Sequence, residues 1–171
     1  MNRPKPLAIL RPLADNPNQA YLSNMLQVAD VLQWILDQTG PAHLQMTSFS
    51  ISEEFLRRIF FIEKAKLIKS LDIVLDFKAT NKTLILWPFI AQTVENCYLA
   101  SNHSKILLVF NDSWTVAVVM SQNLTRGNRF ESGFISTDKS VFEALHQQVN
   151  YVITRQSVPF HEVFARAVGE N

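Results

Sequence analysis

The chain has 171 residues, of which 47% are hydrophobic and 18% charged, and this length suits one domain with a substantial core. The net charge of +1 excludes a general electrostatic bias toward nucleic acid or anionic membranes, so any affinity for phosphate must be local. The single cysteine, Cys97, excludes an internal disulfide framework and favours a reducing, cytoplasmic location. No stretch approaches the roughly 18 apolar residues of a membrane span.

The apolar residues predict strands alternating with helices, which indicates an α/β fold with a mixed β-sheet flanked by helices. The first half is expected to contain a helix over 19–39, a strand over 43–49, a helix over 50–69, a strand over 71–77, a helix that starts near 80 and is interrupted or ends around Pro88, and a strand over 94–100. The second half is expected to contain strands over 103–110, 114–120 and 130–136, a helix over 138–155 and a short helix over 163–168.

Local signals set several boundaries of these elements. Residues 1–18 are rich in proline and are expected to form an N-terminal arm with a short strand at 7–10. Residues 19–156 would form the single domain, and residues 157–171 a C-terminal tail or short helix. Gly40 would end the first helix, and Ser50 with Glu53 predicts a capping box for the second.

The residues that indicate function lie between Ser101 and Glu131. His103 and Lys105 stand at the start of an apolar strand, and the alternation of side chains along a strand predicts that both lie on one face. A lysine on a buried face needs an anionic partner or a bound anion, because an unpaired buried charge costs several kcal/mol. The pair therefore favours a functional site.

The returning strand is expected to bring a hydroxyl and an amide to the same side. If residues 111–113 form the turn, Ser121 lies directly across from His103, and Asn123 reaches the same face one alternation later. A loop one residue shorter would send Ser121 to the opposite face. The predicted convergence is typical of a site that binds an oxyanion beside a nucleophile or general acid.

This segment resembles the phospholipase D superfamily, whose signature is H-x-K, an acidic residue, G-S-x-N and a downstream glutamate. The matching residues are His103, Lys105, Ser121, Asn123 and Glu131. Two positions depart from the signature, because the family's aspartate falls on Phe110 and its glycine on Met120. The resemblance covers roughly residues 43–155 and implies a phospholipase D-like α/β/α sandwich.

The resemblance implies a metal-independent phosphodiesterase that works through a phosphohistidine intermediate. His103 would be the nucleophile or the acid, and Lys105 and Asn123 would bind phosphate. Ser121 would add a donor or hold Glu131, which would orient an imidazole. No metal or cofactor is expected, since lysine and amide donors would stabilise the negative charge.

A single H-x-K motif supplies only one of the two histidines that this mechanism needs. The resemblance therefore implies a homodimer whose pocket lies on the two-fold axis, as in the short nucleases of the family. DNA or RNA is the expected substrate, bound through local basic residues: Lys78, Lys82, Arg126 and Arg129. Two alternatives stay open. One is a nucleic-acid-binding dimer that has lost the chemistry, which Phe110 and Met120 favour, and the other is an enzyme acting on lipid or other small phosphodiesters.

The remaining histidines are expected to be structural or solvent-exposed, and the cysteine to be structural. His43, His146 and His161 lack polar company and have no spacing suited to a metal. Cys97 lies in an apolar stretch and is expected to be buried.

Overall fold

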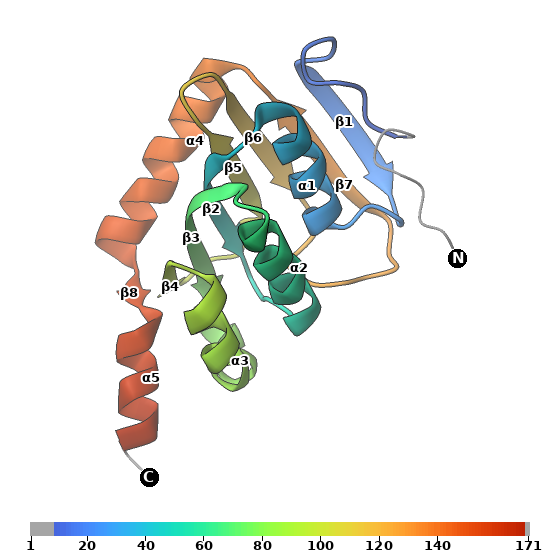
Figure 1. Ribbon diagram of the computed structural model, residues 1–171. Coiled ribbons are helices and arrows are strands. Elements are labelled where there is room, and N and C mark those ends of the chain that lie inside the picture. Colours follow the sequence, from blue (N-terminus) through green and yellow to red (C-terminus); the bar gives the residue numbers. More distant parts are fainter. Residues whose placement is uncertain (1–8, 170–171) are drawn as a thin grey trace.

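The computed structural model describes residues 9–169, except for the side chains of residues 79–83 and 166–169. Its centre is a mixed eight-stranded sheet with helices on both faces (Figure 1). In spatial order the strands are β1 (Asn18–Ser23), β7 (Glu131–Ser136), β6 (Thr115–Met120), β5 (Ile106–Phe110), β2 (Ala42–Ser48), β3 (Ile68–Asp76), β4 (Asn96–Ala100) and β8 (Val158–Pro159). Strands β2, β3 and β4 run parallel, and the other neighbouring pairs are antiparallel. The predicted fold class is confirmed.

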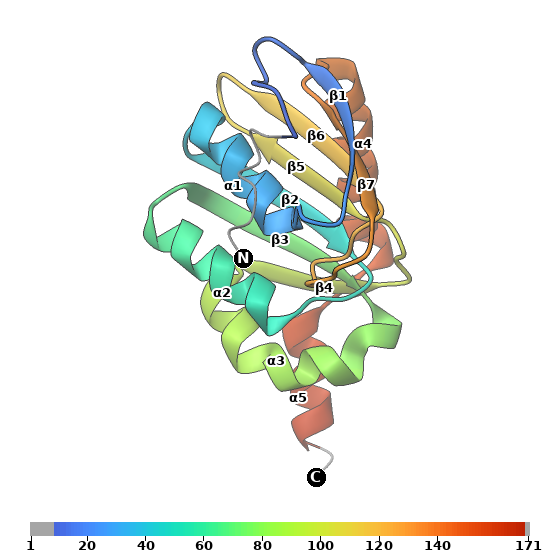
Figure 2. The same cartoon turned by 90° about the vertical axis from the view of Figure 1, so that its right-hand side faces the viewer.

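The helices form the two outer layers of the molecule. One face carries α1 (Val28–Thr39), α2 (Glu53–Lys64) and α3 (Thr80–Thr93), and the other carries α4 (Lys139–Tyr151), which continues through the π-helical turn η3 (Val152–Gln156) toward α5 (Phe160–Gly169) (Figure 2). The large core lies under α1 and α2, and a smaller cluster joins Leu108, Ala117, Phe142 and Val149 beneath α4. Burial on both faces explains why the central strands are continuous apolar runs. No helix in the described part of the chain has the length and apolar content to span a membrane.

The predicted helix over 19–39 is wrong in its first part, where the chain forms strand β1 instead. Within β1, Tyr21 is buried and Leu22 is 69% exposed, which is the alternation of a strand. Tyr21 pairs with Gly133 of β7, and its ring lies so close that a Cβ on Gly133 would meet it at 2.5 Å. A partner about 110 residues away therefore decides the conformation, and helical spacing within the segment does not.

Helix α2 is also shorter than predicted, and its cap is a different serine. The side chain of Ser52 accepts a hydrogen bond from Phe55 N (3.3 Å), while the carbonyl of Ser50 accepts one from Ser48 Oγ (2.7 Å). The helix ends at Lys64, because Lys66 adopts a positive φ of 60° and β3 begins two residues later. Helix α3 instead continues through Pro88 to Thr93.

The other predicted elements are present with boundaries shifted by a few residues. Residues 9 and 10 do not form the predicted short strand, and residues 7 and 8 lie outside the described part of the chain. Instead Leu10 and Leu13 are each 1% exposed and join the core, with Leu13 N donating to Gln38 Oε1 (2.8 Å). Gly40 ends α1 as predicted, with a φ of 74°.

Candidate active site

The hairpin that carries the candidate residues has a four-residue loop, one longer than predicted. Phe110 pairs with Thr115, and Asn111 Oδ1 accepts hydrogen bonds from the backbone N–H groups of Ser113 and Trp114 (3.0 and 2.9 Å). This side-chain turn lengthens the loop, so that Met120 N bonds to Lys105 O (3.0 Å) beyond the paired strands. The prediction that Ser121 lies directly across from His103 is therefore wrong.

His103 and Lys105 precede β5, and they lie together. Lys105 Nζ is 3.2 Å from His103 Nδ1 and donates to the His103 carbonyl at 2.6 Å. Because an ammonium donates and cannot accept, Nδ1 is the acceptor in this contact. Burial lowers the pKa of Lys105, and the negative charge of Glu131 partly opposes this effect. The His103 side chain is exposed and therefore accessible to a substrate.

Asn123 reaches the same place from the loop after β6. Its Oδ1 accepts hydrogen bonds from Ser48 Oγ (3.3 Å) and Phe49 N (3.2 Å), at the end of β2. The amide orientation is thereby fixed, and Nδ2 makes no hydrogen bond with any described residue, so it can donate to a ligand. The Phe49 ring lies 5.5 Å from the His103 ring, so both halves of the motif meet at Phe49.

Ser121 and Glu131 form a second pair beside this cluster. Ser121 Oγ donates to Glu131 Oε2 and accepts from Ser132 N (3.0 Å). Arg129 lies 3.9 Å from the Glu131 carboxylate. Burial, and to a smaller extent the negative charge of Glu131, raises the pKa of Tyr21 to about 12. Ser121 thus holds Glu131, but no carboxylate of the described residues hydrogen-bonds to the His103 ring.

A buried polar network behind His103 was missed in the sequence. Asp76, which ends β3 and is 6% exposed, accepts hydrogen bonds from Asn102 N (2.8 Å) and Lys78 N (2.7 Å). Asn102 in turn donates to the Ser48 carbonyl (3.1 Å) and accepts from Ser104 N (3.2 Å). These bonds anchor the residues on each side of His103. An aspartate that ends an apolar strand was the one available signal.

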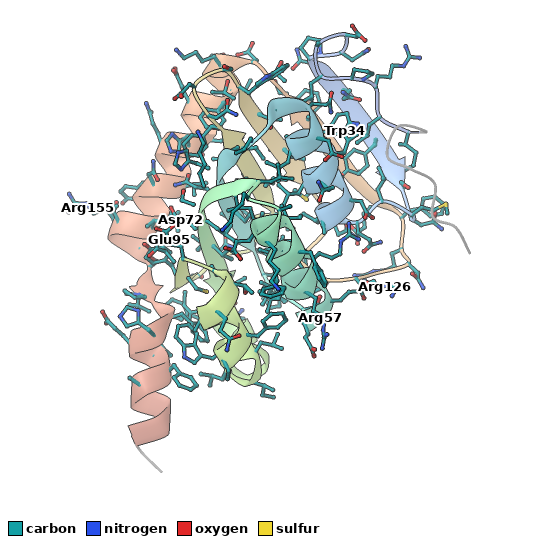
Figure 3. All side chains as sticks on the ribbon, in the orientation of Figure 1. Trp34, Arg57, Asp72, Glu95, Arg126 and Arg155 are labelled. Carbon is teal, nitrogen blue, oxygen red and sulfur yellow. The ribbon has the colours of Figure 1, made fainter. Side chains whose placement is uncertain are left out.

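The predicted basic residues differ in their surroundings. Lys78 is exposed in the short turn η2 (Phe77–Ala79), and Arg129 has a side chain that is 86% exposed. Arg126 pairs with Glu54 at the start of α2 (3.3 Å), and Figure 3 shows it on the same side of the molecule as Arg57. The side chain of Lys82 lies outside the described residues.

Of the two departures from the signature, Phe110 lies far from His103, whereas Met120 lies at the same end of the hairpin and donates its backbone N–H to the Lys105 carbonyl (3.0 Å). Phe110 is at the opposite end of β5, on the order of 17 Å from Lys105 at about 3.3 Å per residue, and its ring packs at a tilt against the rings of Phe142 and His146. Met120 is 8% exposed and belongs to the core. The phenylalanine at the position of the family's aspartate therefore contributes to the packing beneath α4. It is not among the residues that surround the His103 imidazole.

The other histidines are held elsewhere. His43 Nδ1 lies 2.8 Å from Ser70 Oγ, and its ring stacks on Phe110. His146, which belongs to α4, also contacts the Phe110 ring. His161 lies in α5, lining a cavity of about 330 Å³ that Cys97 also lines. Cys97 is 9% exposed, and burial raises its pKa to about 12, as expected of a core thiol. Among the described residues, no group of three or more His, Cys, Asp or Glu could hold a metal ion.

No protein-family model matches the sequence, and a comparison with curated proteins finds no relative. Solved structures do share the fold. Polyphosphate kinase from Porphyromonas gingivalis aligns with a TM-score of 0.59 at 8% identity, over 82% of this chain and 23% of that one. Phosphatidylserine synthase from Haemophilus influenzae gives 0.59 at 11% identity, over 83% and 39%.

NucT from Helicobacter pylori aligns with a TM-score of 0.56 at 12% identity, over 83% of this chain and 98% of NucT. The chain therefore spans under a quarter of the kinase and about two fifths of the synthase, but nearly all of NucT. All three structures are of phospholipase D superfamily members. The chain has the phospholipase D-like α/β/α fold that its sequence predicts, a fold found in phosphoryl-transfer enzymes.

Proposed function

We propose that this protein is a metal-independent phosphodiesterase, acting on nucleic acid, in which His103 forms a covalent phosphohistidine at a site completed by a second copy of the chain. The observation that carries the proposal is the meeting of three groups at the end of β2. Lys105 Nζ lies 3.2 Å from His103 Nδ1, and Phe49 contacts both the His103 ring and the Asn123 carboxamide.

The three groups have complementary roles toward a phosphodiester. The Nδ2 of Asn123 and the ammonium of Lys105 would donate to the nonbridging oxygens and stabilise the charge that develops on them. When Lys105 turns to the phosphate, it releases Nδ1 of His103. The ring proton can then move to Nδ1, which leaves the lone pair of Nε2 free to attack phosphorus.

The chemical steps balance only with a second imidazole. As the Nε2–P bond forms, the P–O bond to the leaving alcohol breaks, and an imidazolium donates a proton to that oxygen. The resulting neutral imidazole then takes a proton from water, whose oxygen attacks phosphorus and breaks the P–N bond. Ser121 would keep Glu131 in place, and Glu131 would favour the charged form of Lys105.

A homodimer is the proposed source of the second imidazole. His43 and His146 are held around Phe110 beneath α4, and His161 lies in α5. Helix α4 covers only part of its face of the sheet. The uncovered part of that face carries exposed apolar side chains on three neighbouring strands: Leu22 (69% exposed), Val119 (46%) and Phe134 (45%). Val119 lies two residues before Ser121, so a copy bound to this face would adjoin the site.

Nucleic acid is the substrate class that we favour. The fold alignment covers nearly the whole of NucT. In a chain of net charge +1, the cations proposed to contact phosphates are Lys78 and Arg129, which are exposed, together with Lys82 and, more weakly because Glu54 pairs with it, Arg126. A cytoplasmic location is part of the proposal, and the buried thiol of Cys97 is consistent with it.

A nucleic-acid-binding dimer without chemistry is the second candidate. It is favoured by the His103 ring, which no described carboxylate orients. A direct test incubates the protein with plasmid, RNA and a chromogenic phosphodiester in EDTA. We expect nucleic acid to be cleaved by the wild type and by His161→Ala, and to remain intact with His103→Ala. Salt-dependent binding without cleavage would favour the second candidate, and cleavage of the small diester alone would favour a lipid or small-molecule enzyme.

A further inference from the structure

We infer, building on the proposed function, that the site selects single-stranded nucleic acid by stacking bases on two exposed phenylalanine rings, Phe77 and Phe130. Each ring has a cation next to it in the chain, Lys78 after Phe77 and Arg129 before Phe130. Phe77 is 43% exposed and Phe130 is 68% exposed.

The hydrogen-bond network places the two rings close to the site. Phe77 directly follows Asp76, whose carboxylate accepts a hydrogen bond from the backbone of Asn102, the residue before His103. Phe130 directly precedes Glu131, which binds Ser121 and interacts electrostatically with Lys105.

Sheet topology puts these residues on opposite flanks of His103. Strand β3 ends, and β5 and β7 begin, at the same end of the sheet, because β5 runs antiparallel to β2 and β7 antiparallel to β6. In the order β7-β6-β5-β2-β3, Phe130 belongs to one flank and Phe77 to the other. A strand of nucleic acid laid across this end would pass His103 between the two rings.

Two exposed rings, each next to a cation, fit single-stranded nucleic acid better than duplex or a small phosphodiester. An exposed aromatic ring beside a cation can stack a base while the cation binds the adjacent phosphate, and such stacking tolerates any sequence. In a duplex the bases are already stacked and cannot reach the rings. A small phosphodiester has no base at either flank.

The distance across the sheet between the two rings also predicts the length of the bound oligonucleotide. Four strand intervals of about 4.8 Å separate β7 from β3, which gives a span on the order of 19 Å. At about 3.4 Å per nucleotide of a stacked strand, this span corresponds to roughly six nucleotides. Affinity should therefore increase with oligonucleotide length up to about this size and change little beyond it.

The test measures binding of fluorescent oligothymidylates of increasing length by anisotropy, using His103→Ala protein so that nothing is cleaved. We expect Phe77→Ala and Phe130→Ala each to weaken binding of a ten-nucleotide strand roughly tenfold, since stacking a base contributes this much. The matched control, Phe61→Ala, removes a ring that is 65% exposed on α2 and should leave binding unchanged. Phe77→Tyr and Phe130→Tyr should keep affinity, which separates stacking from a folding defect.

In the background with His103 intact, the same alanine variants should leave cleavage of a chromogenic phosphodiester unchanged. Duplex bound as tightly as single strands, or no loss in either alanine variant, would overturn the inference. Because binding is measured without turnover, the stacking model and the proposed enzymatic activity can each be rejected independently of the other. Cleavage in EDTA without ring dependence removes only the stacking model, and ring-dependent binding without any cleavage removes only the proposed enzyme.

Discussion

The ammonium of Lys105 lies 3.2 Å from Nδ1 of His103, in a hairpin whose loop is one residue longer than the apolar pattern suggests. In this arrangement the imidazole and the cation that we propose to bind phosphate are in contact in the free protein. In the proposed mechanism, binding of a phosphate exchanges that contact for one with oxygen, so the protonation of Lys105 would control the first step.

The pH dependence of substrate binding follows from the pKa of Lys105. Burial lowers this pKa below the ordinary 10.5, so the ammonium loses its proton at a lower pH than an exposed lysine does. Affinity for phosphate should therefore fall as pH rises through the lowered pKa. We expect KM for a chromogenic phosphodiester to begin rising below pH 10.5 in the wild type, and to stay flat over the same range in Lys105→Arg, whose guanidinium remains charged. An identical alkaline rise in both proteins would show that Lys105 is not the group responsible.

The two ends of the Asn123 carboxamide can be tested separately. Asn123→Asp keeps an oxygen for Ser48 Oγ and Phe49 N but replaces the Nδ2 donor with a negative charge. We expect kcat/KM to fall roughly 10²- to 10³-fold, the usual cost of losing one oxyanion donor, with little change in Tm. Asn123→Ala should also lose stability, by about 1–3 kcal/mol, because it removes the acceptor of Phe49 N. Activity that survives in Asn123→Asp would exclude the amide as a phosphate ligand.

Asp76 should act on His103 through the backbone. Asp76→Ala removes the acceptor of Asn102 N and Lys78 N, and we expect a loss of about 1–3 kcal/mol in the free energy of unfolding, together with lower kcat. Asp112→Ala, in the exposed turn between β5 and β6, is the matched control and should change neither quantity by more than about 0.5 kcal/mol or its equivalent in rate. Urea denaturation and steady-state kinetics give both values. A stable but slow Asp76→Ala would mean that the carboxylate acts on the chemistry directly.

The proposed dimer can be tested by its mass in solution and by the activity of a mixed dimer. Val119→Glu and Phe134→Glu each place a charge on the uncovered sheet face and should give a monomer in sedimentation equilibrium, while Phe61→Glu on α2 should not. A heterodimer of one wild-type and one His103→Ala chain, purified with two different tags, should be inactive because only one imidazole remains. A wild-type monomer that cleaves substrate would rule out the shared site.

The sequence allowed much of the fold and the main site residues to be predicted, and its failures have physical causes. His103, Lys105 and Asn123 were predicted to meet from the alternation of side chains along the strands and from the resemblance to the H-x-K and S-x-N signature. The structure brings the three residues together at the end of β2, and their roles stay a prediction. Ser121 was misplaced because the side chain of Asn111 sets the loop length, which an apolar pattern does not record.

Longer-range relationships were missed for a similar reason. Strand β1 was predicted as helix because its conformation depends on Gly133, far along the chain. Asp76 was missed because its partner, Asn102, is 26 positions away, and an aspartate at a strand end is equally typical of solvent exposure. The division into an arm over 1–18, a domain over 19–156 and a tail over 157–171 stays a prediction, although Leu10 and Leu13 pack in the core.

The covalent intermediate on His103 is the central claim, and intact-protein mass spectrometry after a rapid alkaline quench tests it most directly. During turnover of a short single-stranded oligonucleotide in EDTA, we expect a nucleotidyl adduct that is stable to alkali, lost in acid and located on the peptide containing His103. The adduct should be absent from His103→Ala and present in His161→Ala. Cleavage of the oligonucleotide with no adduct, or with the adduct on another residue, would contradict the mechanism.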